Sequence, residues 1–178
     1  MIYISFSIGM VAVCIGWILF RFLAYCHTKT LDWRYEAKQI FFLINLLVLT
    51  RITFYPFEKL NGQIQPLVFE PAAAWPFRVN LTPFVNLLDY ETRSTMLLNV
   101  IGNSAMFIPT GIMTPMIYKS RNSLKKVVAT GFLISLTIEI LQLPFAVRAS
   151  DVDDLILNTA GCFAGYCIYA LIRRFRKK

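Results

Sequence analysis

Five long apolar runs, separated by shorter polar stretches, dominate the pattern of the chain. They lie at residues 3–23, 39–57, 96–118, 127–145 and 155–172. A helix rises about 1.5 Å per residue, so a run of roughly twenty residues is long enough to cross a hydrocarbon core of about 30 Å. The pattern therefore predicts an all-α fold, a polytopic membrane helical bundle of about five transmembrane helices.

The polar stretches indicate how these helices are oriented. Most of the 18 basic residues follow the first, third and fifth runs, and basic loops tend to stay in the cytoplasm. We therefore predict an N-terminus outside and a C-terminus inside the cell. Residues 1–38 would hold the first helix and a cytoplasmic loop, and residues 39–178 the main transmembrane domain. The stretch 77–88 is apolar but too short to span, so it either lies flat in the interface or re-enters.

Composition agrees with a membrane location and limits the classes of partner that we expect. Hydrophobic residues make up 57% of the chain, charged residues only 16%, and the mean hydropathy is +0.57, whereas soluble domains are about a quarter charged. The net charge of +8 comes from residues that flank apolar runs, as topology signals do. We therefore expect membrane lipids and no nucleic acid as partners.

Polar residues inside the apolar runs gather at one depth. Arg51, Asn103, Glu139 and Asn158 each lie within about seven residues of the predicted outer end of a span, which places them roughly 5 to 10 Å from the outer boundary. Ionisable residues in a membrane are costly and usually face a bundle interior or a wet cavity. We therefore predict a binding cavity open to the outer face. Its predicted residues are Arg51, Arg78, Asn80, Asn99, Asn103, Glu139, Gln142, Arg148, Asp151, Asp154 and Asn158.

A structural interpretation of the same residues stays open. Arg51 and Glu139 would then form an ion pair, and the amides would form interhelical hydrogen bonds worth under about 1 kcal/mol each. Gly161 and Gly165, four residues apart after Asn158, fit close helix contact in either case.

Signatures of an enzyme are missing from the predicted cavity. It contains no histidine, and the chain has no HExxH motif and no phosphate-cradling glycine loop. We predict no catalytic residue, no metal site and no cofactor. Two alternatives stay open: an intramembrane enzyme on a lipid-linked intermediate, with Glu139 or Asp154 as acid or base, and a small lipid transporter. A cation held by Asp151, Asp153 and Asp154 is a weaker possibility.

Several short motifs occur in a fixed order along the chain. They are NLTPF at 80–84, NVIGN at 99–103, FIPTG at 107–111, SLTIEILQ at 135–142, DVDD at 151–154 and NTAG at 158–161. In this order the chain, from about residue 40 to 172, resembles the VanZ-like family of small bacterial membrane proteins. The resemblance implies a helical bundle in the bacterial cytoplasmic membrane and a link to reduced teicoplanin susceptibility.

The combined expectation is a non-enzymatic membrane protein. We expect the polar residues to bind a lipid-linked or anionic component of the cell envelope and thereby to lower susceptibility to teicoplanin-type glycopeptides. The expected partners are membrane lipids or a lipid-linked envelope precursor, and the sequence leaves oligomerisation open.

Overall fold

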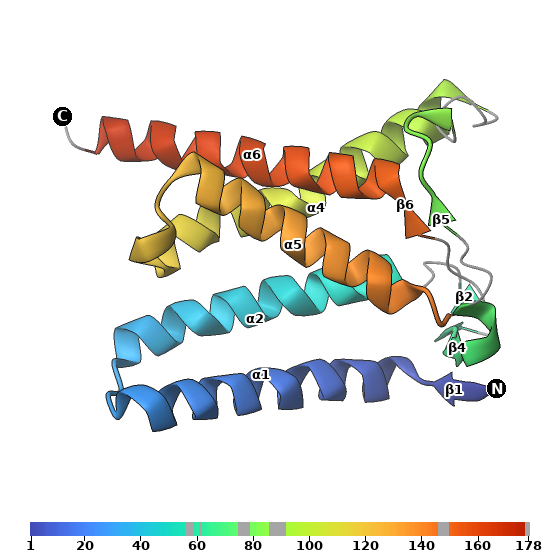
Figure 1. Cartoon of the computed structure of the whole chain (residues 1–178), viewed down its shortest axis with the longest axis horizontal. Helices are drawn as coiled ribbons and strands as arrows, with labels where there is room; N and C mark the ends of the chain where they lie inside the picture. Colours follow the sequence, from blue (N-terminus) through green and yellow to red (C-terminus); the bar gives the residue numbers. More distant parts are fainter. Residues whose placement is uncertain (56–58, 61, 75–78, 86–91, 146–149, 177–178) are drawn as a thin grey trace. The chain divides into compact units, whose positions relative to one another are not determined.

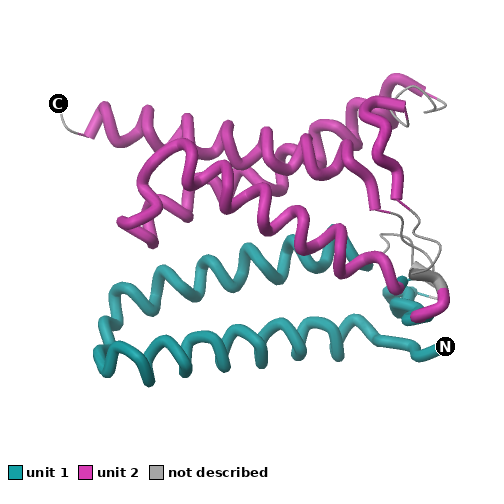
Figure 2. The backbone as a smooth tube through the Cα atoms, in the orientation of Figure 1, with its two compact units in different colours: residues 1–70, 145–147 teal, residues 71–144, 148–178 magenta. Residues whose placement is uncertain are grey.

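The computed structural model describes residues 1–55, 59–60, 62–74, 79–85, 92–145 and 150–176 (Figure 1). The chain forms two compact units, shown in different colours in Figure 2. Unit 1 comprises residues 1–70 with 145–147, and unit 2 comprises residues 71–144 with 148–178.

Unit 1 is a pair of helices, α1 (Phe6–Thr28) and α2 (Trp33–Phe54). The side chain of Ser5 caps α1 by accepting a hydrogen bond from Ile8 N (3.3 Å). Asp32 caps α2 in the same way, because its carboxylate accepts from the first backbone N–H groups of the helix. Lys29 ends α1 in the left-handed conformation, with φ 54°.

Short strands accompany the helix pair of unit 1. The strand β1 (Ile2–Ile4) pairs antiparallel with β4 (Leu67–Phe69), and β2 (Lys59–Leu60) pairs with β3 (Gln63–Ile64). The buried Tyr55 ties the end of α2 to the start of α1, because its hydroxyl donates to the Ser5 carbonyl (3.2 Å).

One ion pair links the far ends of α1 and α2. The guanidinium of Arg21 binds both carboxylate oxygens of Glu36, with Nε donating to Oε2 at 3.1 Å and Nη2 donating to Oε1. Both side chains are partly exposed, at 19% and 23%, so the pair contributes little. We expect Arg21→Met to lower the free energy of unfolding by about 1 kcal/mol or less. Denaturant titration in detergent measures this, and a loss several times larger would show that the pair organises unit 1.

Unit 2 contains three long helices. They are α4 (Arg93–Ile117), α5 (Leu124–Gln142) and α6 (Val152–Phe175). The 3-10 turn η2 (Lys119–Arg121) follows α4, and another, η1 (Pro71–Ala74), opens the unit. The strand β5 (Val79–Asn80) pairs in parallel with β6 (Ser150–Asp151), directly before α6. In Figure 1, α6 runs alongside both α4 and α5, and its contact with α4 is the more extensive.

Glycines let α4 and α6 approach until their backbones touch. A Cβ atom on Gly161 would lie well within 3.0 Å of the Ser104 carbonyl, and one on Gly165 would meet the Ile108 carbonyl in the same way. On α4, Gly111 faces the backbone of Cys162 equally closely. The close contact predicted from Gly161 and Gly165 is therefore confirmed.

The predicted all-α fold is confirmed, with differences at the ends of the helices. The described residues form five long helices, of which α1, α2, α4 and α6 are long and apolar enough to span a membrane. The fourth predicted span falls on α5, which carries Lys125, Lys126 and Glu139 within 19 residues, so its crossing of the membrane stays a prediction. Residues 3 and 4 were expected in the first helix and instead belong to β1. The orientation and the boundary at residue 38 also stay predictions.

Candidate functional site

The site is organised around the start of α6, where the chain turns from β6 into the helix. Asp151 is the N-cap, and its Oδ1 accepts from Asp153 N (2.9 Å). Asp153 and Asp154 occupy the first turn, where negative charge complements the unpaired N–H groups and the helix dipole. The local sequence thus explains why three aspartates can stand together here.

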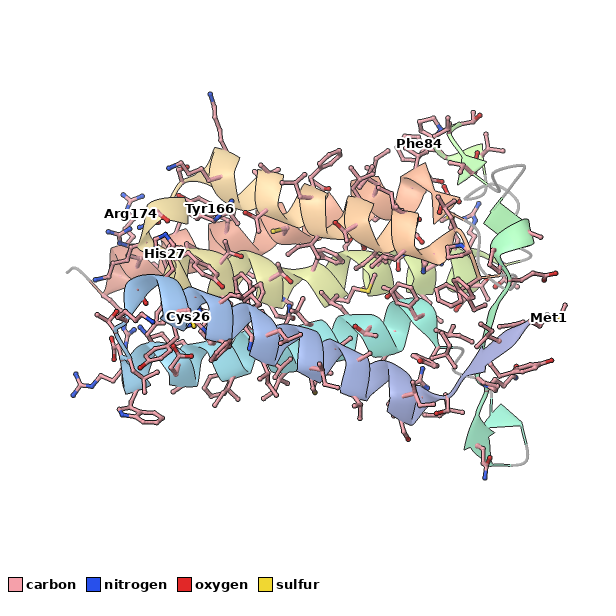
Figure 3. All side chains as sticks on the ribbon, turned by 60° about the horizontal axis from the view of Figure 1, so that its bottom comes forward. Met1, Cys26, His27, Phe84, Tyr166 and Arg174 are labelled. Atoms are coloured by element: carbon pink, nitrogen blue, oxygen red, sulfur yellow. The ribbon has the colours of Figure 1, made fainter. Side chains whose placement is uncertain are left out.

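Residues 79–85 fold across this helix start. Asn80 Nδ2 donates to Asp151 Oδ1 (3.3 Å), and Phe84 N donates to Asp153 Oδ1 (2.8 Å). Asn80 also shapes its own loop, because its Oδ1 accepts from Thr82 N (3.0 Å). Phe84, labelled in Figure 3, has a left-handed backbone with φ 66°. The carboxylates of α6 therefore hold the NLTPF segment in place.

Asp153 itself is buried by this arrangement, with 4% of its surface exposed. Its Oδ1 bonds to Phe84 N, whereas its Oδ2 is buried without a hydrogen-bond partner. The list predicted from the sequence omitted Asp153 as a binding residue. Helical spacing gives no signal for it, because the covering segment lies about 70 residues earlier in the chain.

The helix α4 brings two amides to the same place. Asn103 Nδ2 donates to Asp154 Oδ1 across the α4–α6 contact, and the same nitrogen lies 3.3 Å from Asn99 Oδ1 on its own helix. Asn99, Asn103 and Asp154, all three on the list predicted from the sequence, thus lie together in the structure.

Glu139 of α5 completes the group from the other side of α6. Its Oε2 accepts from Asp151 N (3.1 Å), and its backbone carbonyl accepts from the hydroxyl of buried Ser150 (2.7 Å). Glu139 is 7% exposed. One turn earlier on α5, Ser135 Oγ accepts from Asn158 Nδ2 (2.9 Å), while Asn158 Oδ1 is buried without a hydrogen-bond partner. Gln142 is also buried, on the face of α5 that carries Ser135 and Glu139.

We call this group of side chains the polar cluster. Its members are Asn80, Asn99, Asn103, Ser135, Glu139, Ser150, Asp151, Asp153, Asp154 and Asn158. Ser135, Ser150 and Asp153 were not on the list predicted from the sequence. Gln142 is placed beside them by its helix.

The three predicted arginines have different outcomes. Arg78 and Arg148 lie outside the described residues. Arg51 belongs to unit 1, where its Nη1 donates to the Tyr55 carbonyl (2.7 Å) and its guanidinium lies 5.8 Å from the centre of the Phe6 ring. Binding by any of the three, and the ion pair of Arg51 with Glu139, stay predictions.

The described cluster is rich in hydrogen-bond acceptors. Four carboxylates meet there, and each accepts from a backbone N–H or an amide. The aspartates at 151, 153 and 154 direct their bonded oxygens to separate donors, and the described residues include no group of three or more side chains placed to hold a metal ion. Ionised carboxylates accept hydrogen bonds and do not donate them, so the cluster offers acceptors to its surroundings.

Comparison with known proteins agrees with the order of the motifs. The model of the VanZ/LLP1 family matches residues 42–173, a range that contains the whole polar cluster. Protein VanZ of Enterococcus faecium is 38% identical over 93 residues, which cover 52% of this chain and 53% of that protein. The chain thus spans about half the length of this relative. No solved structure matches the chain. With three quarters of its length inside the family match, the chain belongs to the VanZ/LLP1 family.

Proposed function

We propose that this protein, in the bacterial cytoplasmic membrane, binds the polar headgroup of a lipid-linked envelope component with its polar cluster. In doing so it lowers susceptibility to teicoplanin-type glycopeptides. The observation that carries the proposal is a pair of buried acceptors without partners, Asp153 Oδ2 and Asn158 Oδ1. An unpaired buried polar atom costs about 1–3 kcal/mol, so a bound group that donates a hydrogen bond to these atoms would recover that free energy.

The cluster also indicates which part of a headgroup it would hold. Its described side chains are carboxylates, amides and hydroxyls, and the carboxylates accept hydrogen bonds only. They suit the hydroxyl groups of a sugar or an ammonium group. The phosphate of a lipid-linked precursor needs a cation instead, and Arg78 and Arg148 are our candidates for it from the sequence. We therefore assign the sugar or amino part of the headgroup to the described cluster.

The contacts of the serines favour binding over nucleophilic catalysis. Ser150 donates to the backbone carbonyl of Glu139, and Ser135 accepts from the Asn158 amide. An activated nucleophile would instead lie within hydrogen-bond reach of a general base. Glu139 is the carboxylate nearest to Ser135 along α5 and would be the candidate general base. Its Oε2 instead accepts a hydrogen bond from Asp151 N.

Teicoplanin susceptibility tests this function in cells. We expect expression of the wild-type protein in a susceptible Gram-positive host to raise the minimal inhibitory concentration, and Glu139→Ala to abolish the rise. The matched control is Thr137→Ala on the same helix, because Thr137 is exposed and bonds only to the Leu133 carbonyl of its own helix among the described contacts. Immunoblots of membranes establish equal protein levels. Full protection by Glu139→Ala at wild-type level would refute a role for the cluster.

A further inference from the structure

A second distinctive surface lies at the other end of unit 2. Figure 3 labels Phe84 at the end that carries the polar cluster and Arg174 at the opposite end. At that opposite end, a pocket of about 770 Å³ opens between the last turns of α4, the turn η2 and the last turns of α6. We call it the basic pocket, because Lys119, Arg173 and Arg176 line it.

The interior of the basic pocket is apolar. Ile112, Pro115 and Met116 contribute from α4, and Ile172 contributes from α6. Met116 and Ile172 are exposed, at 49% and 50%, so the pocket joins the outer surface of the helix bundle. A soluble ion would gain nothing from contact with these apolar side chains. A lipid chain lying along the helices would cover them and remove their apolar surface from water.

The charges around the pocket have one sign. None of its lining residues is acidic, and the described carboxylates of unit 2 all belong to the polar cluster at the other end. Within the described residues, no ion pair engages Lys119, Arg173 or Arg176. Two neighbouring basic side chains form hydrogen bonds to neutral groups: Lys126 Nζ donates to the Ser120 carbonyl (2.7 Å) and Arg121 Nη1 to Thr130 Oγ1 (3.1 Å).

We propose that the basic pocket binds an anionic phospholipid of the cytoplasmic leaflet. The lipid phosphate lies among Lys119, Arg173 and Arg176, and the upper part of an acyl chain covers Ile112, Met116 and Ile172. Basic pockets between transmembrane helices on the cytoplasmic side are suited to anionic headgroups, and the volume is within the ~300–1,000 Å³ of pockets that hold small molecules. The basic pocket shares no residue with the polar cluster, so lipid binding by the pocket is tested independently of the proposed function.

The experiment uses the full chain in nanodiscs that contain equal amounts of phosphatidylcholine and phosphatidylglycerol with matched acyl chains. Native mass spectrometry counts the lipids retained on the released protein. The pocket variant is K119Q/R173Q/R176Q. The control is K125Q/K126Q/R174Q, which removes three charges from the same end of unit 2 without touching the pocket lining.

We expect the wild type and the control to retain phosphatidylglycerol in preference to phosphatidylcholine. The pocket variant should lose that preference by roughly tenfold or more, because it lacks the three cations that would contact the lipid phosphate directly, and charge-assisted hydrogen bonds to phosphate are strong. An equal loss in the control would overturn the proposal in favour of general surface attraction. Displacement of the retained lipid by excess glycerol phosphate would overturn it in favour of a soluble phosphate ligand.

The wild type alone provides a second test, which does not depend on the folding of any variant. Titration with the two lipids in detergent should give tighter binding of phosphatidylglycerol, weakened by added salt because exposed charges are screened. Equal affinity for both lipids would overturn the proposal even if the pocket variant failed to fold.

Discussion

The Gly161→Leu variant is expected to lose the packed pair of α4 and α6. A Cβ at this position would collide with the backbone of Ser104, which cannot rotate away as a side chain could. Overpacking of a core by side chains typically costs 1–3 kcal/mol, so we expect this backbone collision to cost more than about 3 kcal/mol. The measurement is the denaturant midpoint in detergent, together with the yield of folded protein from membranes.

A second glycine provides the matched control for this prediction. Gly102 also lies inside a long helix of unit 2, yet a Cβ there would meet nothing within 4 Å. Gly102→Leu should therefore fold as well as the wild type or slightly better, because leucine has the higher helix propensity. If Gly161→Leu and Gly102→Leu had the same denaturant midpoint, the close approach of α4 and α6 at Gly161 would be contradicted.

The double variant Ser135→Ala/Asn158→Leu is expected to lose headgroup binding while keeping or gaining stability. Asn158 is 1% exposed, and only its Nδ2 has a described partner, Ser135 Oγ. Replacing both partners of a buried hydrogen bond by apolar groups of similar shape can be neutral or stabilising, and here it also removes an unsatisfied acceptor. Unfolding in detergent measures stability, and lipid retention in native mass spectrometry measures binding.

This double variant separates the functional from the structural interpretation of the cluster. If the bond serves only to join α5 to α6, its removal should leave lipid retention unchanged and lower stability by no more than the roughly 0.6 kcal/mol typical of such interhelical bonds. The control is Thr159→Ala, next along α6, because Thr159 bonds to the Leu155 carbonyl of its own helix. Lower stability with intact retention in the double variant would favour the structural interpretation.

Sequence patterns could predict contacts between residues that both lie on regular helices. Asn99 and Asn103 share a face because they are four residues apart, and equal depth in the bundle brought them to Asp154. Gly161 and Gly165 indicated close contact in the same way. Periodicity and helix rise are local properties of the chain, so the all-α fold and the cluster residues within the long helices could be predicted from them.

The remaining contacts depend on segments that no periodicity connects. The parallel pairing of Val79–Asn80 with Ser150–Asp151 involves two residues on each side, too few for an alternating pattern. That pairing places Phe84 N beside Asp153, where it donates to the carboxylate and helps to bury it. Asp153 was therefore missing from the list of binding residues predicted from the sequence. The helix α2 starts at Trp33, earlier than the predicted residue 39, because Asp32 caps it. A capping residue sets where a helix begins, whereas the apolar run shows only which part of the helix is hydrophobic.

Binding of an envelope lipid by the polar cluster is tested most directly by native mass spectrometry of gently purified protein, wild type beside Glu139→Gln. Glutamine keeps an acceptor for Asp151 N and removes only the charge, so the fold should persist. We predict a co-purified envelope lipid on the wild type that is lost from Glu139→Gln. Apart from phospholipid in the basic pocket, which Glu139→Gln does not touch, the same envelope lipid bound equally to both proteins, or none on either, would contradict the assignment of the cluster as a binding site.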